Sequence, residues 1–166
     1  MGFWTTASGF ISTSMGDGTT ASGDYSTAMG VGTTASGGAS NTMGVFTTAS
    51  GNISTAMGHE TKSNTYGMVT FGRFNDTTKY NGDNSYSSWY DNDPLFAIGK
   101  GAADNARSNA ITVMKNGRMG LQTVINPTYA LELPNNATIG IGQARAYAWA
   151  TYSDGRAKTE RQTLPY

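Results

Sequence analysis

The chain has no cysteine, only four prolines, one histidine and few charged side chains, which make up 13% of its 166 residues. Without cysteine it can form neither a disulfide framework nor a thiolate metal site. Eleven Lys and Arg balance eleven Asp and Glu, so net charge gives no reason to expect nucleic acid or an anionic membrane surface as a partner. No apolar run approaches the ~20 residues that a membrane-spanning helix needs. We therefore expect no cofactor, no nucleic-acid partner and no membrane insertion.

What the sequence has in place of these features is a repeat of 14 residues, of which TTASGDYSTAMG (19–30) is typical. A Ser-Gly pair and a Met-Gly pair each recur with this spacing. The methionines of the repeat are Met15, Met29, Met43 and Met57. Met1-Gly2 lies one period earlier, so the repeat begins in mid-unit and we expect the chain to be a piece of a longer protein.

A period of 14 residues favours one coil of a β-solenoid, with two strands of about five residues and two tight turns. The glycines at the two ends of the unit are expected to supply the positive φ of those turns. Strand alternation places Ala28 on one side and Thr27 and Met29 on the other. Successive coils would stack as parallel strands ~4.8 Å apart. The sequence therefore predicts an all-β fold.

One coil of this kind buries very little, because it offers only Ala, small hydroxyl side chains and one Met. Small units with thin cores need neighbours for stability. The methionine column would form a narrow apolar stripe, which three rods could close against one another. We therefore expect a homotrimer.

The units TTASGDYSTAMG and TTASGNISTAMG resemble the head repeat of trimeric autotransporter adhesins, the YadA-like heads. In that repeat ASG is followed by two variable residues and then by S-x-A-aliphatic-G. Here methionine replaces the usual Ile or Leu, and Asn41 and Thr42 interrupt the third unit. The resemblance covers residues 1–62 and implies a trimeric, left-handed parallel β-roll packed around a threefold axis.

The composition changes after the repeat, with eight aromatic residues between positions 66 and 96. TYGMVTFGRF (65–74) is expected to be a strand that leaves the roll, and PLFAIGKG (94–101) a strand that returns. Asn116-Gly117, between apolar runs in 109–123, predicts a β-hairpin. Short strands are also expected at 129–133, 136–142 and 144–152.

Four aromatic residues in this part, Tyr80, Tyr86, Trp89 and Tyr90, lie among Asp and Asn. Aromatic faces beside polar groups commonly hold sugars, so these residues are candidates for binding a surface glycan. Alternatively they fill a widened trimer core where the roll ends. That interpretation is favoured for Trp89 and Phe96, and the two are evenly balanced for the three tyrosines.

Metal sites are less favoured. The Asp and Asn residues at 75–93 could ligate calcium, but their spacing does not match an EF-hand loop. His59, as the only histidine, could reach a metal only on a threefold axis, and a solvent-facing turn is the favoured interpretation.

The segment SDGRAKTERQTLPY (153–166) resembles the opening of the endosialidase-type intramolecular chaperone found at the end of many phage tail fibres. Its boundary pattern S-D-x-R-x-K is matched by Ser153, Asp154, Arg156 and Lys158. The resemblance implies trimerisation by a chaperone and self-cleavage before Ser153, with Ser153 as nucleophile and Lys158 as base. Locally, Ser153 is an equally good N-cap of an ordinary helix.

These observations predict three parts: head repeats at 1–64, an aromatic-rich fibre tip at 65–152 and the start of a chaperone at 153–166. We expect a homotrimeric tail fibre of a phage, or of a phage-tail-like injection system, that attaches to a cell-surface glycan. Its place would be extracellular, on a virion, on an injection-system fibre or on a bacterial surface. The alternatives are the head of a bacterial trimeric adhesin and a self-cleaving fibre precursor. No pattern indicates an enzyme that acts on an external substrate.

Overall fold

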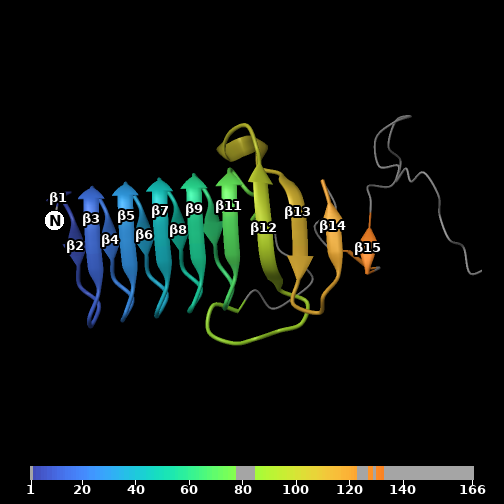
Figure 1. Cartoon of the computed structure of the whole chain (residues 1–166), viewed down its shortest axis with the longest axis horizontal. Helices are drawn as coiled ribbons and strands as arrows, with labels where there is room; N and C mark the ends of the chain where they lie inside the picture. The colour runs from blue at the N-terminus through green and yellow to red at the C-terminus, as the bar shows by residue number, and fades with distance from the viewer. Residues whose placement is uncertain (1, 78–84, 123–126, 129, 133–166) are drawn as a thin grey trace, which may run out of the picture.

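The computed structural model describes residues 2–77, 85–122, 127–128 and 130–132. They form a stack of β-coils with two sheets (Figure 1). Sheet A has ten strands in the order β1-β3-β5-β7-β9-β11-β12-β13-β14-β15, and sheet B has five in the order β10-β8-β6-β4-β2. The one helical segment among these residues is the short 3-10 turn η1 (Asp104–Ala106). The all-β class and the solenoid of 14-residue coils are confirmed.

Each regular coil contributes one strand to each sheet. The sheet A strands of the coils are β1 (Gly2–Phe3), β3 (Thr13–Asp17), β5 (Thr27–Val31), β7 (Asn41–Val45), β9 (Thr55–His59) and β11 (Val69–Arg73). The sheet B strands are β2 (Thr6–Ala7), β4 (Thr20–Ala21), β6 (Thr34–Ala35), β8 (Thr48–Ala49) and β10 (Lys62–Ser63). The expectation of two five-residue strands is therefore wrong for the second strand, which has only two residues.

The coils stack in parallel with a register of one full repeat, so that Met15 lies opposite Met29 and Ala28 opposite Thr42. The predicted alternation is confirmed, because Ala28 is fully buried while Thr27 and Met29 on either side of it are partly exposed. Side chains that point inward are mostly Ala, Ser and Thr, and the buried apolar side chains of the two sheets in the regular coils are all alanines: Ala21, Ala28, Ala35, Ala49 and Ala56. The core of one chain is thus as thin as the composition predicts.

Both glycine columns allow close backbone approach between coils, but only one of them has a positive φ. Gly30 has a φ of +118° and a Cβ there would lie 2.0 Å from the carbonyl oxygen of Gly44 in the next coil. Gly23 does not have a positive φ, but a Cβ would lie 2.1 Å from the carbonyl oxygen of Gly37. The expectation that both columns supply positive φ is therefore wrong for the Gly23 column, where close backbone approach requires glycine. In that turn the positive φ falls on Tyr25.

Residues 61–74 form one more coil of the roll. β10 pairs in parallel with β8, and β11 pairs in parallel with β9, with Thr70 opposite Ala56. The prediction that 65–74 leaves the roll is wrong, because this coil keeps the fold after losing the Ser-Gly and Ala-Met pairs of the repeat.

After the last coil the strands of sheet A no longer all run parallel. β12 (Pro94–Lys100) runs parallel to β11, and β13 (Asn109–Met114) is antiparallel to β12. β13 and β14 (Met119–Leu121) form the predicted hairpin, with Gly117 at a φ of +83°. β15 (Leu131–Glu132) confirms part of the strand expected at 129–133. The strands expected at 136–142 and 144–152 lie outside the described residues.

Candidate functional site

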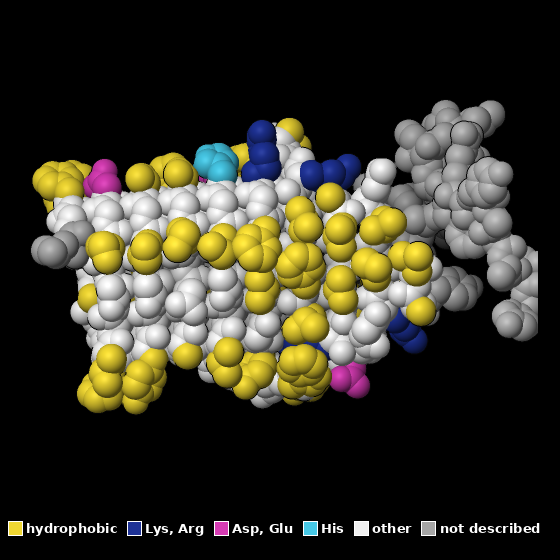
Figure 2. Space-filling model, in the orientation of Figure 1, with side chains coloured by type: hydrophobic (Ala, Val, Ile, Leu, Met, Phe, Trp, Pro, Cys, Tyr) yellow, Lys and Arg dark blue, Asp and Glu magenta, His cyan; other side chains and the backbone are white. Residues whose placement is uncertain are grey.

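An apolar stripe runs along the outer face of sheet A, with one side chain from each of eight neighbouring strands. Its members are Met15, Met29, Met43, Met57, Phe71, Ile98, Ile111 and Leu121. Figure 2 shows a row of hydrophobic side chains along this face. Met15 and Met43 are 44% and 45% exposed in the single chain. Exposed methionines in a regular row are an unusual surface for an isolated protein, because they leave apolar area in water.

The apolar area widens toward the later strands. In β3 to β9 the row beside the stripe carries Thr or Asn, but from β11 onward the same row carries Val69, Phe96, Val113, Met119 and Leu131. The rings of Phe71 and Phe96 lie 6.0 Å apart between their centroids. The late part of sheet A therefore presents two adjacent apolar rows where the regular coils present one.

The aromatic segment at 85–93 lies beside the turns of the last coils. The amide of Asn52 donates to the carbonyl of Tyr86 over 2.7 Å, and that of Tyr66 donates to the carbonyl of Ser85 over 2.8 Å. Tyr86 and Trp89 are 65% and 51% exposed, and Tyr90 is also exposed. Three of the four predicted ligand-binding aromatics thus lie in one surface segment, while Tyr80 is outside the described residues.

Trp89 is oriented by two contacts. Its indole N–H donates to Asp91 over 3.1 Å, and its ring lies 4.9 Å from the ammonium nitrogen of Lys115. Phe96 lies on the outer face of sheet A and is partly exposed. The suggested burial of Trp89 and Phe96 in a trimer core stays a prediction, because a single chain does not test it.

The candidate calcium ligands that the structure describes have structural partners. Asn75 is fully buried and its side-chain amide bonds both backbone groups of Lys62. Asp93 is buried beside Lys115. His59 is exposed but is the last residue of strand β9 and not a turn residue, and its ring lies edge-on to Phe74. Within the described ranges no three His, Asp or Glu side chains gather as metal ligands. Asp83 and Asn84 are outside those ranges.

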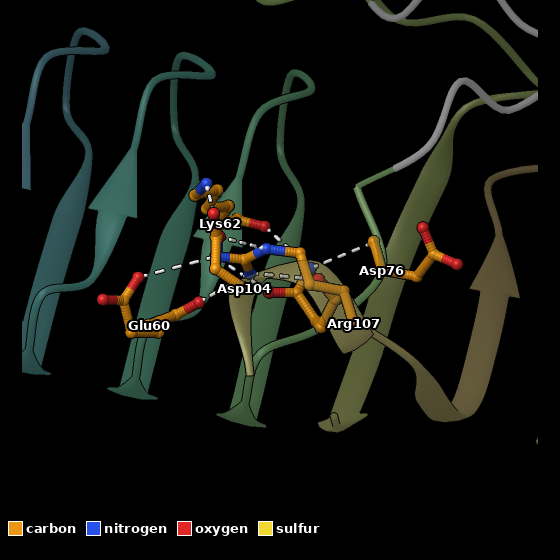
Figure 3. Close-up of polar contacts among 6 residues, drawn as sticks. Glu60, Lys62, Asp76, Asp104 and Arg107 are labelled. Carbon is orange, nitrogen blue, oxygen red and sulfur yellow. Dashed lines mark hydrogen bonds and ion pairs between the residues drawn. The ribbon is translucent and has the colours of Figure 1, made fainter. Parts of the chain in front are cut away.

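A polar cluster that the sequence did not indicate fastens the η1 connection to the last coils (Figure 3). Arg107, whose side chain is only 9% exposed, donates to Asp104 and to the backbone carbonyl of Glu60, each over 2.8 Å. Its guanidinium also lies over the ring of Phe74. The hydrogen bond and charge of Arg107, followed by the charge of Lys62, hold the pKa of Asp104 below its usual 3.8. We call this group the Arg107 clamp.

No sequence motif marks the Arg107 clamp, because Arg107 and Glu60 are 47 residues apart.

The predicted self-cleavage residues Ser153 and Lys158 lie outside the described residues. In the part of the chain that the structure describes, no helix is long and apolar enough to cross a membrane. Comparison with known proteins finds no family model, no curated protein and no solved structure that matches this chain.

Proposed function

We propose that this chain is the structural and receptor-binding part of a homotrimeric tail fibre, from a phage or a phage-tail-like injection system. It would act outside the cell by attaching to a cell-surface glycan. The observation that carries this proposal is the apolar stripe, which continues without a break across eight strands and is exposed or partly exposed at each of them in a single chain.

The direction of the apolar stripe supports an assembly of copies around the long axis, and the resemblance to trimeric adhesin heads favours three copies. The stripe crosses the strands and therefore follows the long axis of the stack. Copies related by rotation about that axis would bring the same side chains together at every coil. Burial of apolar surface contributes about 25 cal/mol per Å². Burying the stripe between copies would therefore add apolar contacts that the Ala, Ser and Thr core of one chain does not provide.

Charge substitution in the apolar stripe tests the trimer. We expect wild-type protein to sediment as a trimer, and the double variant Met29→Glu with Met43→Glu to dissociate because it would bury charge. The matched control is Thr20→Glu with Thr34→Glu, on the outer face of sheet B, where both residues are only partly buried. A wild-type chain that is folded by circular dichroism yet monomeric at micromolar concentration would refute the assembly.

The exposed aromatic segment supports glycan binding. Tyr86, Trp89 and Tyr90 present ring surface to solvent, and Asp91 and Asn92 supply polar groups beside them. Tyr86→Ala and Tyr90→Ala should weaken binding of the trimer on a glycan array. The control is Phe3→Ala, which removes an exposed ring from the start of the roll. Unchanged binding in both site variants would place recognition elsewhere.

The head of a bacterial trimeric adhesin would present the same stripe, and the chaperone-like residues 153–158 are what favours a fibre. The self-cleaving precursor makes a separate prediction. Mass spectrometry of the full-length parent should then detect a product that ends at Tyr152, and Ser153→Ala should abolish it.

A further inference from the structure

A lysine and an aspartate are buried together where sheet A changes direction. The ammonium nitrogen of Lys115 lies 3.6 Å from a carboxylate oxygen of Asp93, and both side chains are fully buried. Lys115 follows β13, in the loop of the hairpin, and Asp93 precedes β12. The backbone holds the two residues opposite each other, because the amide of Lys115 donates to the carbonyl of Asp93 over 2.9 Å.

Two aromatic rings face the lysine side of this pair in cation–π contacts. The ring of Trp89 lies 4.9 Å and that of Tyr66 5.8 Å from the Lys115 nitrogen. Among the described residues that nitrogen has no hydrogen-bond partner. Burial lowers the pKa of Lys115 below its usual 10.5, although the charge of Asp93 acts in the opposite direction. A lysine with a lowered pKa is more often a neutral amine, which is its nucleophilic form.

The carboxylate side offers an electrophile with a hydrogen-bond donor in place. The oxygen of Asp93 that faces Lys115 also accepts the backbone N–H of Ser85 over 3.3 Å. A fixed N–H at this position stabilises negative charge that develops on the oxygen when a nucleophile adds to the carboxyl carbon. Two reacting groups held this close by a backbone hydrogen bond at the end of the β12–β13 pair need little further ordering to react.

We propose that Lys115 and Asp93 become joined by an intramolecular amide bond. A proton passes from the Lys115 ammonium to the Asp93 carboxylate, and the neutral amine attacks the carboxyl carbon. A C–N bond forms and a C–O bond breaks. The leaving oxygen departs as water, carrying two hydrogens that both came from the lysine nitrogen. The step changes no oxidation state and needs no co-reactant.

Such a bond would tie the entry to β12 to the β13–β14 hairpin by a covalent link in a chain without cysteine. The inference depends on neither the trimer nor the glycan, since every group in it belongs to one chain.

Intact-mass measurement of the denatured protein tests it. We expect the wild-type mass to be lower than the sequence mass by one water molecule. Trypsin should then release a branched peptide that joins 80–100 to 108–118, uncleaved after Lys115. Lys115→Arg keeps the positive charge but should restore the full sequence mass and leave the two peptides separate. Asp93→Asn, if it reacts, should lose one ammonia instead of water.

Two results would overturn the inference. One is wild-type protein at its full sequence mass, with normal cleavage after Lys115. The other is loss of water without the branched peptide, which would indicate cyclisation at another Asp. Neither result requires a variant to fold, because both are read from the wild-type chain.

Discussion

The side chain of Asn75 takes the place of a missing strand at the end of sheet B. In the regular coils, the first amide of each sheet B strand donates to a backbone carbonyl of the next coil. The amide of Thr48, for example, donates to the carbonyl of Thr61 over 2.9 Å. Lys62 has no such coil after it. Its amide donates to the Asn75 side-chain oxygen over 2.7 Å, and its carbonyl accepts the Asn75 side-chain N–H over 3.0 Å.

Replacing Asn75 by Ala removes the acceptor of the Lys62 amide and the shorter of two hydrogen bonds to the Lys62 carbonyl, which keeps only the Thr70 hydroxyl over 3.4 Å. A buried backbone group left without a partner costs ~1–3 kcal/mol, and Asn75 itself is fully buried. Lys62 is only partly buried, so water can satisfy some of the loss. We therefore expect Asn75→Ala to lower the free energy of unfolding by about 2–4 kcal/mol.

Hydrogen exchange at the Lys62 amide and urea unfolding measure this effect, with all proteins at equal concentration because an assembled chain gains stability with concentration. The control is Asn64→Ala, since the Asn64 side-chain oxygen has no hydrogen-bond partner in the described part of the chain. That control should change stability by less than about 0.5 kcal/mol. If the Lys62 amide is equally protected in wild type and in Asn75→Ala, the capping argument fails.

Three further predictions concern single positions. Gly23→Ala should lower the free energy of unfolding by about 3 kcal/mol or more, because the new methyl group would lie 2.1 Å from a backbone oxygen that cannot move without separating the coils. Circular dichroism on heating measures this loss of stability, and an unchanged melting temperature would contradict the prediction. Ile53→Gly should stabilise a single chain by about 1 kcal/mol in urea unfolding, since Ile53 has a φ of +59° and is 55% exposed. Asp104 should titrate by NMR with a pKa below 3.8, and Arg107→Ala should move that pKa back toward 3.8. Because the folded-state pKa is lowered, the stability from this contact is present above 3.8 and is lost as the pH falls through the lowered value; an identical pKa in both proteins would exclude the ion pair.

The regular part of the fold could be predicted because it depends on local information. A fixed period of 14 residues sets the coil, and alternation within STAMG places Ala28 inside and Met29 outside. The hairpin at Asn116-Gly117 is equally local, since the turn type requires positive φ at Gly117. These features need no knowledge of what lies across the sheet.

The remaining features depend on contacts between distant positions. The coil at 61–74 was not predicted, because Thr70 and Phe71 replace Ala and Met while they occupy the same places in the register. In the sequence Asn75 is typical of a loop. Its capping role becomes visible only at the end of sheet B, where its side-chain oxygen accepts a hydrogen bond from the Lys62 amide. The Arg107 clamp joins side chains that no spacing rule connects.

The turns raise a question that single-chain stability does not answer. Tyr25, Phe46 and Ile53 are exposed and all have positive φ, a conformation that costs an ordinary side chain roughly 1 kcal/mol or more. Gly18 and Gly32 show that glycine fits the equivalent place in the turn of Phe46. Within one chain the compensation is small, as in the edge-on contact between Phe10 and Tyr25. Bulky apolar side chains at strained, solvent-facing positions are therefore better explained by contacts outside the chain, to other copies or to a ligand. If Ile53→Gly stabilises the isolated chain but weakens the trimer, that explanation holds for Ile53, and if it strengthens both, the side chain contributes no contact.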